Sequence, residues 1–397
     1  MKILFINGLF PKKNNEFGGI FIINRLKHLR EFNIDFECLN PVGIEDKVVK
    51  TIKKLLKLPL SEEEVFIGIK TFGGVSQTFL PFKITILHYL KKSKDPSRLI
   101  YKSIASHIKN NKLKFDLIHS HVVYPHGWIG MKISDEFRIP YLITAHGSDV
   151  NLYMNQNKTI LKKSLNALER AGKVIFVSQA LLNKAKSYGY SGKNAVVISN
   201  GYDPKIFYPM NKELVRKELG IYKENAYYVG FIGNLIEVKR ADKLPEIFHL
   251  MAKKVKNIKF IVVGDGLLRP KIEKEAKDLD IIFTGRIPQQ KVAKWMNAMD
   301  VMILPSKNEG WPCVVLEAQA CGTAVVGSSN GGIPEAIGFD KFVVEEGEEF
   351  EKRLADKVIE ILKDGYDPKI LLERAKDYTW ENIVRKEIEI YKEALNK

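Results

Sequence analysis

The sequence predicts an α/β protein with two doubly wound parallel sheets in tandem, and three observations support this. Short apolar, β-branched segments alternate with helical patterns from end to end, as in successive βα units. The chain has 397 residues, enough for two or three domains at roughly 100–200 residues each. Near the middle, Asn200-Gly201, Pro204 and Pro209 interrupt the pattern, so a domain boundary is expected there.

The expected strands form one group in each half of the chain. The predicted domains are residues 1–203 and 204–379, and residues 380–397 have the apolar spacing of an amphipathic helix. Ligands of such sheets bind beyond the carboxyl ends of the strands, so we expect a cleft between the two domains. The predicted strands are 2–7, 36–42, 116–123, 141–146, 174–178 and 195–199, then 227–233, 259–264, 281–285, 301–306 and 324–329.

Composition excludes several classes of protein. A hydrophobic content of 45% is typical of a globular chain and excludes disorder. Cys38, Cys313 and Cys321 are too few and too scattered for a disulfide framework, which favours a reducing, cytoplasmic compartment. The longest uncharged apolar stretch, residues 226–236, is about half of the ~20 residues that span a bilayer. The N-terminus, MKILFINGLF, is interpreted as a first strand and not as a signal peptide.

The positive charge lies in the first half of the chain. The whole sequence carries 63 Lys and Arg against 47 Asp and Glu, a net charge of +16. Residues 1–205 hold 32 basic and 16 acidic residues, whereas residues 206–397 hold 31 of each. A lysine-rich genome would raise both halves alike, so the asymmetry favours an anionic partner, either a membrane surface or a phosphorylated substrate.

The region from about Glu45 to Lys94 is the hardest to assign. It joins a basic amphipathic stretch, VVKTIKKLLKLPL at 48–60, to an uncharged segment at 71–82. The basic stretch fits a helix that lies on an anionic membrane. The same stretch fits equally well a helix that packs on the sheet and exposes its lysines to solvent.

Two glutamates after the strand at 301–306 carry the strongest chemical signal. Glu309 lies in the following loop, and Glu317 lies inside a helix that Pro312 is expected to begin and Cys321-Gly322 to end. The N-terminus of that helix is an anion site. Gly331-Gly332 forms a second loop in which bare backbone can approach a ligand. Alone, Glu309 could equally be a solvated loop acid.

The segments EGWPCVVLE, ACGTAVV and GGIPE resemble the E-x7-E signature and trailing loop of retaining glycosyltransferases of family 4, which have the GT-B fold. The likeness covers nearly the whole chain, and the order of the motifs makes it specific. The further matching residues are Gly18-Gly19, His146 in TAHGSD, Ser178 in FVSQ, Asn200-Gly201, Gly233 and Lys239 in GNLIEVK, the GDG at 264–266, and the TWENI that precedes the last helix.

The resemblance implies roles for these residues. Glu317 would hold the ribose hydroxyls of a nucleotide-sugar, and Glu309 would contact the sugar. Lys239 would neutralise the diphosphate leaving group. His146 would face the sugar as a hydrogen-bonding group. Around the donor, the resemblance further places Gly18, Gly19, Gly233, Asn234, Gly310, Trp311, Pro312, Cys313 and Val314, with Arg286 and Ile287 bordering the nucleobase.

One position departs from the family pattern. Many members carry Arg where this chain has Asn234, and Asn supplies no charge to a diphosphate. Lys239 and Arg240 are left as the expected cations.

The implied reaction is transfer of a sugar with retention at the anomeric carbon, without a metal or other cofactor and without an evident protein nucleophile. The donor would be a UDP-sugar in preference to a GDP-sugar, and the acceptor a glycan or a lipid-diphosphate-linked glycan in the synthesis of surface polysaccharide. The basic N-terminal half would contact the inner face of the cell membrane. By resemblance, the last helix crosses back onto the N-terminal domain.

Other interpretations stay open at this point. Asp278-Leu279-Asp280 has the letters of a metal-binding D-x-D, but it precedes a strand, at the end where ligands do not bind. His119, His121 and His126 form either a zinc site or, more simply, hydrogen-bonded side chains on one face. A GT-B enzyme with a soluble acceptor and a sugar-nucleotide epimerase remain alternatives. A dehydrogenase lacks the complete G-x-G-x-x-G, and a nucleic-acid-binding protein lacks any recognised module.

Overall fold

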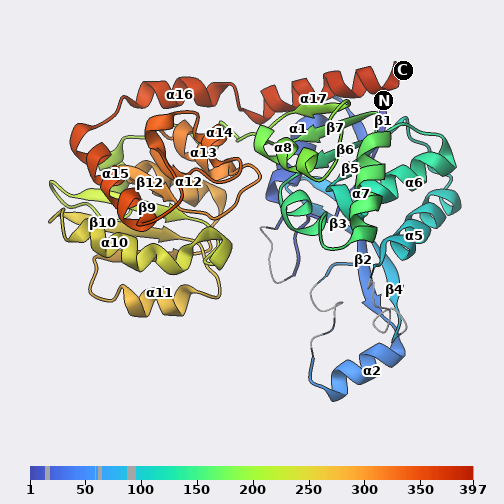
Figure 1. Cartoon of the computed structure of the whole chain (residues 1–397), viewed down its shortest axis with the longest axis horizontal. Helices are drawn as coiled ribbons and strands as arrows, with labels where there is room; N and C mark the ends of the chain where they lie inside the picture. The colour runs from blue at the N-terminus through green and yellow to red at the C-terminus, as the bar shows by residue number, and fades with distance from the viewer. Residues whose placement is uncertain (14–17, 59, 61–64, 87–94, 397) are drawn as a thin grey trace. The chain divides into compact units, whose positions relative to one another are not determined.

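The computed structural model describes residues 1–13, 18–58, 60, 65–86 and 95–396. Contacts divide the chain into two compact units (Figure 1). The N-terminal unit comprises Met1–Ser199 and Ile383–Lys397, and the C-terminal unit comprises Asn200–Asn382. The chain therefore leaves the first unit once and returns to it with its last helix.

The N-terminal unit is built on an eight-stranded sheet in the order β3-β4-β2-β1-β5-β6-β7-β8. All pairs are parallel except β3 with β4, which forms an antiparallel edge. The central strands β5 and β6 are buried at every residue, as expected for a parallel sheet covered on both faces. The strands are β1 (Lys2–Ile6), β2 (Asp35–Glu45), β3 (Gly68–Phe72), β4 (Val75–Ile84), β5 (Leu117–His121), β6 (Tyr141–Ala145), β7 (Lys173–Phe176) and β8 (Ala195–Val197).

Helices follow most of these strands, in the alternation that the sequence predicts. Side chains of Asn157 and Ser178 cap the helices that begin after them, so Ser178 of the FVSQ motif has a structural use. The described helices are α1 (Ile20–Glu31), α2 (Lys47–Leu55), α5 (Ser97–Asn110), η1 (Val123–Gly127), α6 (Trp128–Phe137), η2 (Asp149–Tyr153), α7 (Lys158–Arg170) and α8 (Gln179–Ser187).

The C-terminal unit holds a six-stranded, wholly parallel sheet in the order β11-β10-β9-β12-β13-β14. Its strands are β9 (Tyr227–Ile232), β10 (Ile258–Val263), β11 (Ile281–Gly285), β12 (Val301–Leu304), β13 (Ala324–Ser328) and β14 (Val343–Val344). Its helices are α9 (Lys212–Glu218), η3 (Glu237–Lys239), η4 (Ala241–Lys243), α10 (Leu244–Ala252), α11 (Arg269–Glu275), α12 (Gln289–Ala298), α13 (Cys313–Ala320), α14 (Ile333–Ile337), η5 (Asp340–Phe342), α15 (Phe350–Asp364) and α16 (Pro368–Lys376).

The last helix, α17 (Trp380–Leu395), confirms the helix that the apolar spacing predicts. Its Trp380, Ile383 and Tyr391 side chains are buried. At its start, the backbone of Tyr202 pairs with that of Tyr378 and Trp380, at 3.0 and 2.9 Å. A Cβ on Gly201 would lie 2.8 Å from the Trp380 nitrogen, which explains the glycine of the Asn-Gly pair.

All eleven predicted strands are present, and three strands were not predicted. β3 and β4 lie in the region that the sequence left unassigned, and β14 has only two residues. β2 continues to Glu45, three residues beyond the predicted end at 42. No helix in the described part of the chain is long and apolar enough to cross a membrane.

Candidate active site

The carboxyl edge of the C-terminal sheet brings two glycine loops together. Leu235, after β9, donates its N–H to the Asp265 carbonyl at 3.0 Å. A Cβ on Gly264 would lie 2.0 Å from the Gly233 oxygen, and one on Gly266 would lie 2.4 Å from the Leu235 oxygen. The GDG motif therefore needs glycines because two backbones pack directly on each other.

A pocket of about 440 Å³ opens beside these loops. Two of the predicted donor-binding residues, Asn234 and Arg286, line it, and Ile287 follows Arg286 at the end of β11. The sequence did not assign the four further lining residues to the site, which are Ile236, Asp265, Gly266 and Leu267. Asp265 and Gly266 lie in the GDG motif, and Ile236 lies in GNLIEVK.

Lys239 and Glu309 form an ion pair in this part of the unit. Their Nζ and Oε1 atoms are 2.5 Å apart, and the two side chains are 24% and 12% exposed. The backbone oxygen of Glu309 accepts from Gly332 at 2.9 Å, and a Cβ on Gly331 would lie 2.3 Å from that oxygen. The GGIPE loop therefore packs on Glu309, which brings together three motifs far apart in the sequence.

Arg240 has a different environment from the one expected. Its guanidinium donates to both Glu346 oxygens at 2.9 Å and lies 4.2 Å from the Phe350 ring centroid. Arg240 is 8% exposed. Glu346 therefore neutralises the buried Arg240 guanidinium, as Glu309 neutralises the more exposed Lys239 ammonium.

The helix that carries the second glutamate begins one residue later than predicted. Pro312 is its N-cap, with extended backbone, and the first helical residue is Cys313. The N–H groups of a first helical turn have no carbonyl partner within the helix, so they can face an anion. Gly322, with a φ of +77°, follows the C-cap Cys321 as expected.

Trp311 precedes this helix. Its ring stacks on Tyr378 with centroids 5.7 Å apart. Its indole nitrogen is buried, and no protein acceptor bonds it within the described part of the chain. Gly310, Cys313 and Val314 keep part of their surface accessible on either side of it.

Glu317 lies in α13 and is partly buried. Burial raises the pKa of its carboxyl from 4.5 to about 7. Part of its surface remains accessible, and no described side chain or backbone donor bonds its carboxylate. A desolvated carboxyl without a protein partner is typical of a functional group that receives a ligand.

In the N-terminal unit, the end of β6 positions His146. Asp149 accepts the backbone N–H groups of Val123, His146 and Gly147, at 2.9, 3.1 and 2.8 Å. The carboxylate therefore ties this turn to the loop after β5. Burial raises the pKa of Asp149. Sequence reasoning missed Asp149, although an Asp three residues after His146 is a turn signal.

A buried chain of polar groups runs from His146 to the last helix. His146 Nε2 lies 2.9 Å from His121 Nδ1, and the His121 ring stacks on that of His119. His119 bonds Thr144 at 2.7 Å and the Tyr391 hydroxyl of α17 at 2.9 Å. Burial lowers the pKa of all three imidazoles well below its usual value, so these rings are neutral.

The glycine loop of this unit lies beside His146. Gly19, with a φ of +66°, caps α1, and a Cβ there would lie 2.3 Å from the Leu9 oxygen. Gly18 forms the preceding turn, and Phe21, just inside the helix, packs 5.1 Å from the His146 ring. The predicted residues of this unit are therefore neighbours.

The alternative metal sites find little support. Asp278 bonds His249 at 3.0 Å, and Asp280 pairs with Lys259 at 2.7 Å, so both acids of the D-x-D already have partners. No group of three His, Cys, Asp or Glu within the described residues has an arrangement that could hold a metal ion.

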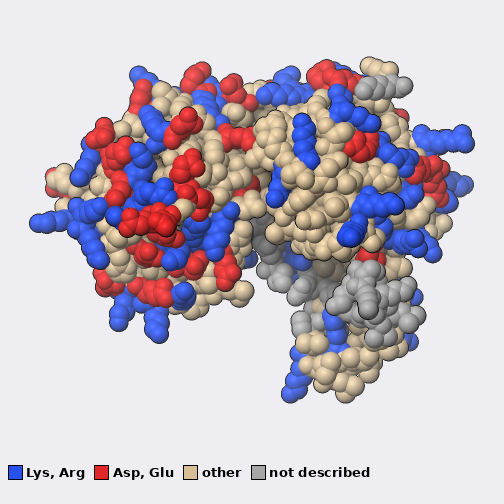
Figure 2. Space-filling view, viewed as in Figure 1, with Lys and Arg blue, Asp and Glu red and all other residues tan. Residues whose placement is uncertain are grey.

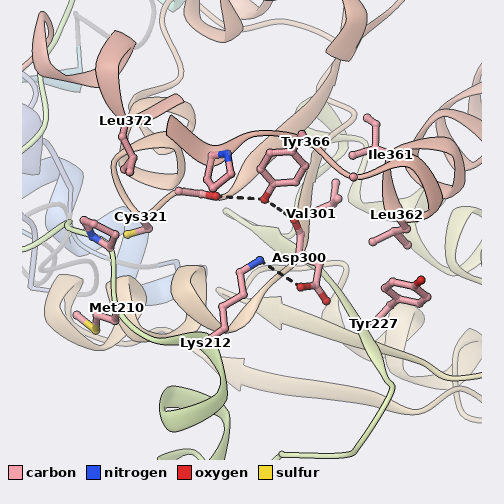
Figure 3. A pocket seen from close by; sticks show the side chains of 14 residues that line it. Met210, Lys212, Tyr227, Asp300, Val301, Cys321, Ile361, Leu362, Tyr366 and Leu372 are labelled. Carbon is pink, nitrogen blue, oxygen red and sulfur yellow. Dashed lines mark hydrogen bonds and ion pairs between the residues drawn. The ribbon is translucent and has the colours of Figure 1, made fainter. Parts of the chain in front are cut away.

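A second cavity of the C-terminal unit, about 360 Å³, opens where β9 and β12 begin (Figure 3). Lys212 pairs with Asp300 at 3.1 Å, and the Tyr366 hydroxyl donates to the Asp300 carbonyl at 2.8 Å. Because its polar groups satisfy one another at the amino edge of the sheet, this cavity is not the expected ligand site.

Comparison with known proteins agrees with this fold. Residues 78–206 match the family model "Glycosyltransferase Family 4", and residues 226–364 match "Glycosyl transferases group 1". The uncharacterised glycosyltransferase MJ1178 of Methanocaldococcus jannaschii is 30% identical over 374 residues, which are 88% of this chain and 94% of that protein. TuaC of Bacillus subtilis, named as a teichuronic acid biosynthesis glycosyltransferase, is 29% identical over 342 residues, 85% of this chain and 83% of TuaC.

Solved structures share the same fold. HepE of Anabaena, in complex with UDP and glucose, matches with a TM-score of 0.70 at 20% identity and covers 99% of both chains. Two doubly wound units of this kind and these matches define a glycosyltransferase of the GT-B fold. Within that class, the chain belongs to glycosyltransferase family 4.

Proposed function

We propose that this glycosyltransferase transfers a hexose or N-acetylhexosamine, with retention, from a nucleotide-diphosphate-sugar to a glycan or lipid-diphosphate-linked acceptor. A UDP-sugar is the favoured donor, and the HepE complex, which holds UDP and glucose, supports this choice. The name of TuaC supports a surface polysaccharide as the product. No metal or other cofactor is part of the proposal.

The observation that carries the proposal is the Glu317 carboxyl. It is partly buried, keeps accessible surface, and has no protein hydrogen-bond donor among the described residues. An acceptor of this kind satisfies its hydrogen bonds when a diol binds, so the ribose hydroxyls of a nucleotide suit it. The pocket at Asn234 and Arg286 would then take the base.

Departure of the nucleotide requires positive charge on the diphosphate. With Asn234 uncharged and Arg240 bound to Glu346, Lys239 is the cation that we assign to it. The Lys239–Glu309 pair holds the ammonium in position before the donor arrives. The first turn of α13 would add its N–H groups on the phosphate oxygens.

His146 would act on the sugar side by hydrogen bonding. Its Nε2 lies 2.9 Å from Nδ1 of the buried His121, and its Nδ1 has no partner among the described residues. A buried ring nitrogen without a partner can form a hydrogen bond to a sugar hydroxyl. Burial holds the pKa of the His146 imidazole well below its ordinary value, so we assign it this hydrogen bond and not the role of a general base.

The acceptor would be reached at an anionic membrane surface. The excess of basic over acidic residues is confined to residues 1–205. An anionic bilayer that holds a lipid-diphosphate-linked acceptor would attract this positive charge, whereas a soluble neutral acceptor would not.

The test is nucleotide release from a panel of UDP-, GDP- and ADP-sugars with EDTA present. We expect release from one donor, lost in Glu317→Ala and kept in the surface control Glu373→Gln on α16. The anomeric configuration of the product, read by NMR, tests retention. A product that is an isomerised nucleotide-sugar would instead identify an epimerase.

A further inference from the structure

Helix α2 stands at the far end of β2 and β4, away from the remaining helices of the N-terminal unit (Figure 1). Asp46 caps it by accepting the Val49 N–H at 2.9 Å. Lys53 pairs with the buried Glu45 at 2.6 Å, and the Val49 side chain is buried. These contacts fix which side of α2 faces the sheet, and therefore which side faces outward.

The outward side of α2 includes an apolar stripe. Val48, Ile52 and Leu55 follow one another at helical spacing and are 54%, 38% and 78% exposed. Leu56 and Leu58 continue the surface at 63% and 50% exposure. Large side chains gathered in this way on an exposed helix mark an interaction surface and not ordinary surface scatter.

Lysines occupy another side of α2, roughly opposite the apolar stripe. Lys47, Lys50, Lys54 and Lys57 repeat at intervals of three and four residues, and residues 47–58 contain no acidic residue. Within the described residues, no ion pair joins Lys47, Lys54 or Lys57 to an acid. Around α2, the surface drawn in Figure 2 is accordingly tan and blue.

We propose that α2 is the membrane-docking helix of this enzyme, with its leucines in the acyl boundary and its lysines on anionic headgroups. A helix with a bulky apolar stripe on one side and lysines on the opposite side fits a membrane interface, whose interior is apolar and whose surface is negatively charged. The inference rests on the proposed function for its acceptor but is tested without it.

The experiment measures cosedimentation of the full chain with vesicles of phosphatidylglycerol and phosphatidylcholine, and with phosphatidylcholine alone. We expect binding to the anionic vesicles, loss in high salt, and at least about tenfold weaker binding in the double variant Leu55→Ser, Leu56→Ser. Replacing Lys47, Lys50, Lys54 and Lys57 by Gln should weaken binding at least as much.

Matched controls lie in the C-terminal unit. Leu214→Ser changes a leucine that is 64% exposed, and Gln at Lys357, Lys363, Lys369 and Lys376 removes equal charge. Both controls should bind vesicles as the wild type does. Equal binding of wild type and α2 variants, no binding of the wild type, or a dimer that the leucine variant abolishes without an effect on vesicles would overturn the proposal.

Calorimetry of UDP and UDP-sugar binding separates this inference from the proposed function. The α2 variants should bind the nucleotide as the wild type does, since α2 belongs to a different unit from Glu317, Lys239 and the pocket at Asn234. Vesicle binding without any nucleotide binding would refute the donor assignment and leave the docking helix standing.

Discussion

The Glu317 carboxylate lowers the stability of the free protein but can bind a ligand. The folded-state pKa of about 7 exceeds the ordinary 4.5, so the folded chain binds more protons than the unfolded chain between these values. Its contribution to stability is therefore lost as pH rises from 4.5 through 7. A ligand that donates hydrogen bonds to the carboxylate offsets that cost.

The first prediction concerns Glu317→Gln. At pH 8 the variant should have a higher melting temperature than the wild type, and its free energy of unfolding should be larger by up to about 3 kcal/mol. Both differences should vanish near pH 4.5. We expect the nucleotide affinity of the wild type to rise between pH 6 and 8. The affinity of the variant should not change over this range. Thermal melts and calorimetry over pH measure both, with Glu373→Gln as the control. A gain that is the same at every pH would contradict the assignment.

The second prediction compares two neighbouring cations. Lys239→Met should weaken the binding of a nucleoside diphosphate by at least about tenfold, because it removes a charged hydrogen bond. Arg240→Met should leave that affinity within a few-fold and lower the melting temperature, because it removes the hydrogen bonds of the guanidinium to Glu346. Calorimetry and thermal melts decide. Equal losses of affinity in both variants would show that Arg240 also serves the diphosphate.

At the scale of single elements, α17 is unusual because it carries a fully buried acid, Glu387. Glu387 is fully buried between Arg25 of α1 and His119 of β5, with an oxygen 3.4 Å from each, and it also accepts from Tyr391. Breaking such a buried pair leaves an uncompensated charge.

The third prediction follows for Glu387→Gln. It should destabilise the N-terminal unit by about 3 kcal/mol, since Arg25 keeps its charge without a carboxylate. Glu389→Gln, on the exposed side of the same helix, should change stability by less than about 0.5 kcal/mol. Thermal or urea unfolding measures the difference. Indistinguishable melts would mean that Glu387 is not the counter-ion of Arg25.

At the scale of the whole molecule, the division into two units makes a separable prediction. Residues 200–382 contain a complete six-stranded sheet, the pocket at Asn234, and Glu309 and Glu317. This fragment should fold alone and bind UDP within about tenfold of the full chain, without transferring sugar. Circular dichroism and calorimetry test this. A folded fragment that does not bind nucleotide would mean that the donor needs the N-terminal unit.

The amino-acid sequence alone predicted the family and most of the helices and strands. Strands of a parallel sheet that is covered on both faces are continuous apolar runs, so the sequence predicted eleven strands correctly. The ordered motifs sufficed to identify a family 4 glycosyltransferase. It failed at β3 and β4, whose alternating and partly exposed residues resemble loop in a region rich in lysine. It also placed Pro312 inside the helix, one residue too far, because helix starts depend on local backbone angles.

Which carboxylate each cation pairs with depends on the tertiary structure. Lys239 and Arg240 are adjacent and chemically alike in the sequence, yet one pairs with Glu309 and the other with Glu346, residues far along the chain. Likewise, nothing in the letters of 47–58 says whether its leucines are covered, and the fold leaves them exposed. Partners and burial arise from contacts between distant segments, and these depend on how the sheets order their strands rather than on local pattern.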